Sequence, residues 1–261
     1  MRKAFVAILV MLPLVSGSLV GCTERLLQGS GNLKTEEMDF TGFTRIEVGN
    51  AFSVEVIQSD SYSVSITADD NLFDGYIRVS QAGKTLKINL KPSITFEPVT
   101  LKAKVTMPGI RKLTLSMASK ATITGFDSSE DLEIALSGAS SLEMNDITTG
   151  DIQLDLSHAS KVTGDVAASG DVKFNLSAAS KANLTGSAHN MVINASAASQ
   201  LNLDTLRVHN ANVILKSASR ATVNLGGRLD ANLNGASKLK YTGNPIMGNI
   251  NTSGGSTLSK K

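Results

Sequence analysis

Hydrophobic and polar residues alternate with a period of two over much of the chain. The clearest runs carry Ile134 and Leu136, Leu154 and Leu156, Phe174 and Leu176, and Val213 and Leu215, each with polar residues between. Alternation of this kind is typical of β-strands that bury one face. No segment with a helical period separates the runs, so the pattern predicts an all-β protein.

The runs belong to a repeat that is marked by Ala-Ser pairs. "LSHASKVTG" at 156–164 returns as "LSAASKANL", and an earlier relative reads "LSGASSLEM". The serines of these pairs are Ser119, Ser140, Ser160, Ser180, Ser199, Ser219 and Ser237, at intervals of 21, 20, 20, 19, 20 and 18 residues. "GGS" ending at Ser256 adds an eighth mark. Each repeat therefore reads as a strand, a tight corner, a second strand and a looser turn.

Stacking these units predicts a parallel β-solenoid over residues 38–258. Its coils hold about 20 residues, its winding is expected to be right-handed, and equivalent strands lie about 4.8 Å apart. We expect bulky side chains to collide at the corner, where alanine fits and serine bonds to the backbone. The serines are not expected to be nucleophiles, because no base accompanies each one.

The N-terminal part carries a related but less regular pattern. "RIEVGNAFSVEV" aligns with "KLTLSMASKATI", which matches Ile46 to Leu113 and Val48 to Leu115 and predicts an early coil. About three irregular coils would fit between Phe52 and Ser119. Within them "YIRVSQAGKTLKINL" reads as a hairpin that turns at Ala82-Gly83. We expect this irregular end to cap the stack and to block pairing at its edge.

The first 21 residues read as a secretory signal. Arg2 and Lys3 precede an apolar run, and small residues follow to Gly21. "LVGC" resembles the bacterial lipobox, and Cys22 is the only cysteine. The resemblance implies a lipidated Cys22, including palmitate, followed by a polar tether over 22–37, and a secreted protein anchored to the cell membrane or outer membrane. An ordinary cleaved signal and a retained membrane helix are the alternatives.

The segment after the tether resembles a known family. "GFTRIEVGNAFSVEVIQSDSYSVSITADDNLFDGYIRV", together with "LKINLK", is similar to the start of the putative auto-transporter adhesin, head GIN domain family. Gly49-Asn50-Ala51 stands where that family has Gly-Ile-Asn. The serine-rich repeats and the terminal "NTSGGSTLSK" extend the likeness to about 39–258. The resemblance implies an envelope-exposed, often lipid-anchored β-solenoid without an established activity.

Composition narrows the chemistry. The net charge is +2, Trp is absent and aromatic residues make up 4%, so neither nucleic-acid binding nor stacking on bases or sugars is expected. His189 and His209 occupy the same place in adjacent coils, whereas His158 lies in a corner. Two histidines without a cysteine or a placed carboxylate make no metal site. We therefore expect no metal and no cofactor.

One row of acids raises an enzymatic alternative. Asp131, Asp151 and Asp171 share one position in consecutive coils, followed there by Asn190 and Asn210. Stacked carboxylates could serve a carbohydrate-active β-helix enzyme, or they could shape the bend at the start of a strand. The change from Asp to Asn favours the structural role, so we expect no catalytic residue and no enzyme activity.

A basic row is the main surface feature. Five cations follow the repeat serine, interrupted by Ser141 and Gln200: Lys120, Lys161, Lys181, Arg220 and Lys238. The row is either a solvated face or a contact for a polyanion, such as an acidic surface polysaccharide or anionic lipid headgroups. Self-association through the open C-terminal coil is a further possibility. The sequence thus predicts a non-enzymatic envelope lipoprotein with a binding, adhesion or structural surface.

Overall fold

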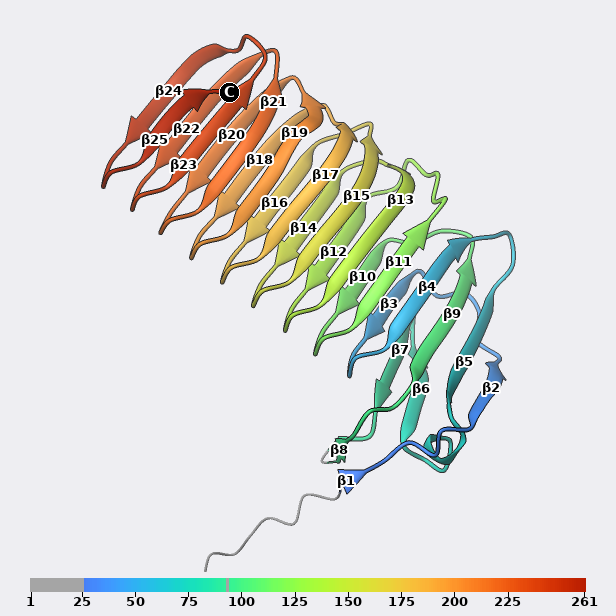
Figure 1. Cartoon of the computed structure of the whole chain (residues 1–261). Helices are drawn as coiled ribbons and strands as arrows, with labels where there is room; N and C mark the ends of the chain where they lie inside the picture. The colour runs from blue at the N-terminus through green and yellow to red at the C-terminus, as the bar shows by residue number, and fades with distance from the viewer. Residues whose placement is uncertain (1–25, 93) are drawn as a thin grey trace, which may run out of the picture.

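The fold is a long stack of β-strands in two facing sheets. The computed structural model describes residues 26–92 and 94–261. One short 3-10 helix, η1 (Asp70–Leu72), interrupts the strands of this part. The coils follow one another from a wider N-terminal end to the C-terminus at the opposite end of the stack (Figure 1). The all-β parallel solenoid is therefore confirmed.

The two large sheets face each other along the stack, and most coils contribute one strand to each. The eleven-stranded sheet has the order β24 (Ile246–Thr252), β22 (Arg228–Leu233), β20 (Asn210–Leu215), β18 (Asn190–Ala195), β16 (Val172–Leu176), β14 (Ile152–Leu156), β12 (Leu132–Leu136), β10 (Lys112–Leu115), β3 (Arg45–Val48), β7 (Thr85–Leu90) and β6 (Ile77–Ala82). The twelve-stranded sheet has the order β2 (Leu33–Met38), β5 (Ser63–Asp69), β9 (Leu101–Met107), β4 (Ser53–Gln58), β11 (Lys120–Thr124), β13 (Ser141–Thr149), β15 (Lys161–Ala168), β17 (Lys181–Ser187), β19 (Gln200–Val208), β21 (Arg220–Leu225), β23 (Lys238–Thr242) and β25 (Thr257–Lys260). A third, two-stranded sheet joins β1 (Leu26–Leu27) to β8 (Thr95–Phe96).

The alternating apolar residues fill the space between the two sheets. Strand β16 is in parallel register with β14, so that Phe174 lies beside Leu154 and Leu176 beside Leu156. All four side chains are buried, and Phe174 is fully enclosed. Each coil thus covers the apolar residues of its neighbour, which no single coil could do alone.

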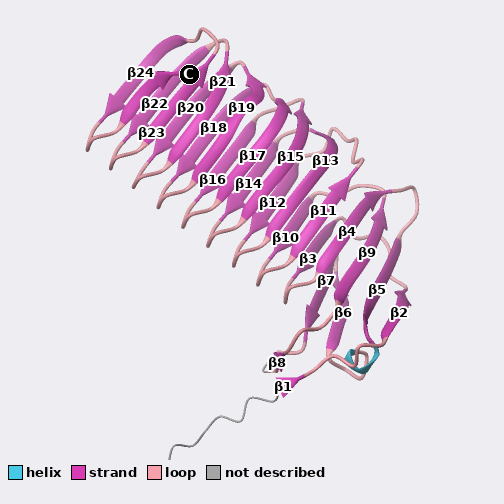
Figure 2. Cartoon of the chain, viewed as in Figure 1, coloured by secondary structure: helices cyan, strands magenta, loops and turns pink. Residues whose placement is uncertain are grey.

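The corners are tight turns that repeat along one edge of the stack (Figure 2). The two residues before each repeat serine have positive φ, as in a type I′ turn; His158 has a φ of 54° and Ala159 a φ of 62°. The Ala159 N–H donates to the Ala178 carbonyl in the next coil, at 2.8 Å. This bond between coils offsets part of the strain of a left-handed, non-glycine backbone.

The serine, not the alanine, is the residue packed inside the corner. Ser160 is fully buried, and its Oγ donates to the Ser157 carbonyl at 2.7 Å. Ala159 is exposed, so the expectation that alanine is needed to avoid a collision inside the corner is wrong. The left-handed backbone of the turn has a steric cost for every residue with a Cβ, and alanine adds no bulk beyond that atom.

The first coil is confirmed, but its place in the stack differs from the expected order. Strand β3 pairs with β10, which brings Ile46 beside Leu113 and Val48 beside Leu115. The chain then runs away from the repeats and returns as β7 and β9, which pair with β3 and β4 on their other side. Only one further coil of parallel strands therefore lies below β3 and β4, where about three coils were expected.

Antiparallel strands close the N-terminal end. Strands β6 and β7 form the expected hairpin, but its turn is Gly83-Lys84 and not Ala82-Gly83, because Ala82 pairs with Thr85. Strands β5 and β2 extend the other sheet. The expected tether over 22–37 is wrong for its last part, because β2 begins at Leu33. That strand was hard to foresee because both of its faces are largely exposed. The predicted signal 1–21 and Cys22 lie outside the described residues.

Replacing the buried corner serine tests this account. Ser160→Ala removes the hydrogen bond to the Ser157 carbonyl, so we expect the free energy of unfolding to fall by about 1 kcal/mol. Ser157→Ala is the matched control: Ser157 is half-buried, and no hydrogen bond from its hydroxyl occurs in the described residues. Urea unfolding of both variants gives the comparison. Equal losses at the two positions would contradict a specific role for the buried hydroxyl.

Candidate binding surface

The structure aligns the predicted cations in one row across the twelve-stranded sheet. Each one opens its strand directly after a corner. The register runs from Lys120 through Ser141, Lys161, Lys181, Gln200 and Arg220 to Lys238. All five cations are exposed.

The row continues one step further than the sequence predicted. Lys120 is in register with Ser53 of β4, and Ser53 is in register with Lys102 of β9. Lys102 is exposed as well. Its place could not be read from the repeat, because β9 precedes the repeats and lies below a coil that is earlier in the chain. We call Lys102, Lys120, Lys161, Lys181, Arg220 and Lys238 the basic ridge.

The charges of the basic ridge are not neutralised by the protein. Seven ion pairs occur in the described residues, and none of them includes a ridge cation. Two like-charged pairs lie directly opposite each other on neighbouring strands, Lys161 with Lys181 and Arg220 with Lys238. Like charges in such positions destabilise a sheet. The ridge therefore has an electrostatic cost that no ion pair in the described chain offsets.

The eleven-stranded sheet shows the opposite arrangement. Its corresponding outward row contains both signs, with Arg45 and Lys112 followed by Glu133, and later Lys173 and Asp230. Lys112 and Glu133 form an ion pair at 2.6 Å. A face that only keeps a protein in solution mixes its charges in this way. The single sign of the basic ridge thus distinguishes it from the other face.

The predicted acid row has a structural role in the stack. The Oδ1 of Asp131 accepts the Asp151 N–H at 2.9 Å, and the Oδ1 of Asp151 accepts the Asp171 N–H at 2.8 Å. Asp171 accepts in the same way from Asn190, and Asn190 and Asn210 are joined through their side chains. The acids line a groove of about 610 Å³. Their carboxylates accept hydrogen bonds from the backbone of the next coil and do not face one another across the groove.

The last acid of this kind shows the same chemistry. Asp230 bonds to the Arg228 side chain and accepts the Asn249 N–H at 2.7 Å. The hydrogen bond from Arg228, and then that from Asn249, hold the pKa of the Asp230 carboxyl below its usual value. A carboxyl stabilised in its charged form is a hydrogen-bond acceptor, not a proton donor.

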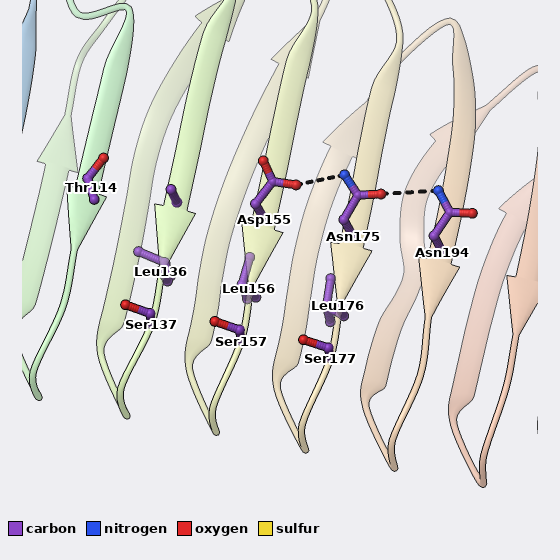
Figure 3. Close-up of a pocket in the computed structure, with 11 residues that line it drawn as sticks. Thr114, Leu136, Ser137, Asp155, Leu156, Ser157, Asn175, Leu176, Ser177 and Asn194 are labelled. Carbon is purple, nitrogen blue, oxygen red and sulfur yellow. Dashed lines mark hydrogen bonds between the residues drawn. The ribbon is translucent and has the colours of Figure 1, made fainter.

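A second polar ladder lies closer to the corner of the same sheet (Figure 3). The Asn194 amide donates to Asn175 at 3.1 Å, and the Asn175 amide donates to Asp155 at 2.6 Å. These residues line a shallow groove of about 390 Å³. Because the ladder residues bond to one another from coil to coil, they stabilise the stack as the acid row does.

The three histidines do not form a metal site with other ligands in the described residues. The His189 and His209 rings are neighbours, with centroids 6.4 Å apart and planes tilted by 50°, and His158 lies in a corner turn. The described residues hold no group of three or more His, Cys, Asp or Glu side chains that could bind a metal ion. In the same part of the chain, no helix is long and apolar enough to cross a membrane.

The C-terminal end of the stack is open. Strands β24 and β25 each pair on one side only, and Ile246 and Met247 are 71% and 42% exposed. Lys260 is in register with Tyr241, and its Nζ donates to Asn244 at 2.7 Å. A lysine on an edge strand discourages pairing with another chain. Self-association through this end stays a prediction.

The fold is that of a parallel β-solenoid with two sheets and a capped N-terminal end, and one row of its surface cations forms no ion pair in the described residues. A family model described as putative auto-transporter adhesin, head GIN domain, matches residues 42–245. The chain belongs to this family. A comparison with curated proteins gives no match.

Solved structures share the fold. A putative adhesin from Parabacteroides merdae superposes with a TM-score of 0.82 at 16% identity, covering 91% of this chain and 99% of the other. A putative lipid binding protein from Parabacteroides distasonis gives 0.78 at 21% identity, covering 91% and 100%. A putative adhesin from the same organism gives 0.76 at 17% identity, covering 90% and 100%.

Substitution of an acid tests the structural role of its row. In Asp151→Asn the side-chain oxygen still accepts the Asp171 N–H, as Asn210 accepts the Arg228 N–H in its own coil. We expect unfolding free energies within about 0.5 kcal/mol of the parent for Asp151→Asn, and a loss of about 1 kcal/mol for Asp151→Ala. Thermal or urea unfolding measures both. If Asp151→Asn destabilised the protein as much as Asp151→Ala, the charge of the carboxylate would have a role beyond the hydrogen bond to the Asp171 N–H.

Proposed function

We propose that this chain is a non-enzymatic, lipid-anchored protein of the cell envelope that binds an anionic partner along its basic ridge. One observation carries the proposal: six exposed cations stand in register on one sheet without an ion pair or an acid among them. Such a row attracts counter-ions and extended anions. A partner of opposite charge would remove the repulsion between the paired cations.

The family supports a binding role. Its description is that of an adhesin, and two of the structural neighbours are described as putative adhesins. A third neighbour is described as a putative lipid binding protein. Anionic lipid headgroups are therefore a second class of partner for the same cations, and experiments must separate them from polymers.

An anchor at Cys22 fits the direction of the stack. The lipobox-like "LVGC" ends four residues before Leu26, where the described chain begins in β1. Strand β1 lies at the N-terminal end and the C-terminus at the far end (Figure 1). An acylated Cys22 would hold the N-terminal end at the membrane, and the ridge would extend outward from Lys102 to Lys238.

The anchor is tested by Cys22→Ser. A serine cannot form the thioether, so we expect the protein to leave the detergent phase and the membrane fraction, or to keep its signal uncleaved. Phase partitioning with Triton X-114 and intact-mass spectrometry provide the measurements. Unchanged partitioning and unchanged mass would refute lipid attachment at this residue.

The ridge is tested by charge reversal on immobilised dextran sulfate. We expect Lys161→Glu with Lys181→Glu to elute at clearly lower salt than the parent, because exposed charges act over about 10 Å at 0.1 M salt. Thermal stability should change little, because both side chains face solvent.

The matched control reverses two exposed cations on the side of the other sheet: Lys173 in β16, and Lys91, which directly follows β7. Neither takes part in an ion pair in the described residues. Both double variants change the net charge by the same amount. If they elute at the same salt concentration, binding depends on overall charge, and the ridge is only a solvated face.

A further inference from the structure

A neutral polar row runs directly beside the basic ridge. Two residues after the ridge position, each strand turns another side chain outward, and five of these are Thr122, Thr163, Asn183, Asn202 and Thr222. We call them the hydroxyl–amide row. Within the described chain, no hydrogen bond from the side chains of Thr122, Asn183, Asn202 or Thr222 occurs, so their polar groups are available to a ligand.

The corner turns lie on the other side of the basic ridge. The residue directly before the repeat serine is a small, exposed alanine at Ala118, Ala139, Ala159, Ala179 and Ala198, whereas one position earlier Met117 and His158 are larger and also exposed. A ligand on the ridge can therefore settle between the alanine corners and the hydroxyl–amide row. Glu143 interrupts the hydroxyl–amide row in β13, and Glu55 stands in its line in β4. Lys104, which pairs with Glu55, and Lys240 lie at the two ends of the same row. Between these ends, from β11 to β21, the positive surface is a line one side chain wide and not a plane.

The line is long compared with a single headgroup or small anion. Lys102 and Lys238 are eight strand steps apart in the sheet order, which corresponds to roughly 38 Å at about 4.8 Å per step. A flat lipid surface would be met by a plane of cations, whereas a line of this length suits one extended chain that runs along the stack.

The side chains of the ridge and its neighbours also select the chemistry of that chain. Five of the six ridge cations are lysines, which act as point charges, whereas arginine is favoured where a phosphate is held by paired bonds. Among the described strands of this sheet, the only aromatic residue is Tyr241, which packs against the core. Bases of a single-stranded nucleic acid would find no ring to stack on. Hydroxyl and amide groups bind the hydroxyls of a sugar.

Resting on the proposed function, we propose that the partner is a linear acidic polysaccharide lying along the stack. Its carboxylates contact the basic ridge, and its hydroxyls bond to the hydroxyl–amide row. Asn183 and Asn202 stand at the middle of this surface, beside Lys181 and Gln200, and are the side chains that distinguish a sugar chain from another polyanion.

The test compares two polycarboxylates that differ in hydroxyl groups. Polygalacturonate is the sugar polymer, and poly-L-glutamate of equal charge number is the polymer without hydroxyls. By isothermal titration calorimetry, we expect the protein to bind polygalacturonate about tenfold more tightly, the effect of two modest hydrogen bonds. Asn183→Ala with Asn202→Ala should remove that difference and leave poly-L-glutamate binding unchanged.

The control for the asparagines lies on the other sheet. Asn212 and Asn232 are exposed on the eleven-stranded sheet, and Asn212→Ala with Asn232→Ala should bind both polymers as the parent does. Oligogalacturonates of increasing length should gain affinity until they span the ridge, and then gain no more.

The outcomes separate the two proposals. Equal affinity of the parent for both polymers would overturn the polysaccharide assignment and leave the polyanion ridge intact. Tighter binding to vesicles that contain anionic lipid than to polygalacturonate would also overturn it, in favour of headgroups. If charge reversal at Lys161 and Lys181 leaves the binding of every probe unchanged, the proposed function itself is wrong.

Discussion

The repeats depend on one recurring contact: at every corner from Ser119 to Ser237, the buried serine donates a hydrogen bond to the carbonyl three residues before it. That bond holds together a turn in which two residues have left-handed backbones, as Ala178 and Ala179 do before Ser180. The turn in turn donates to the next corner, from Ala179 to Ala197. Because these corners have the same geometry, the strands that follow them begin at equivalent positions and pair in register. The register of both sheets follows from this repetition.

The position of the basic ridge is a consequence of that register. Each ridge cation of the repeats comes directly after a corner serine, as Lys181 follows Ser180, and so stands at the first residue of its strand. A deletion of one residue between two corners would turn the following side chain inward, since neighbouring strand residues face opposite sides. The same constraint that builds the core therefore builds the surface.

The sequence predicted what repetition determines. The 20-residue period predicted the strands, the buried alternation and the row of cations, and the match of Ile46 to Leu113 predicted that the N-terminal part forms a coil. It could not give the order of coils at the N-terminal end, because β7 and β9 follow the first coil in the chain but lie below it. Lys102 was missed for that reason. Strand β2 was missed because a polar edge strand shows little alternation.

The role of alanine at the corner shows a different limit. Small size was visible in the sequence, but two physical causes produce it, a crowded interior and a left-handed backbone. Ala159 is exposed at a φ of 62°, so the second cause applies. The serine beside it bonds to the backbone as expected, and its side chain is fully enclosed. Composition alone cannot tell which of two adjacent small residues points inward.

The contrast between the two outward rows argues that the basic ridge serves binding. Both rows arise from the same repeat, and both have the same opportunity to mix their charges. On the eleven-stranded sheet, Lys112 pairs with Glu133, whereas on the other sheet Lys161 lies opposite Lys181. Stability alone favours the first arrangement. The second keeps its charges free of ion pairs at intervals of one or two strands over the length of the stack, and an extended anion is the kind of partner that can contact all of them at once.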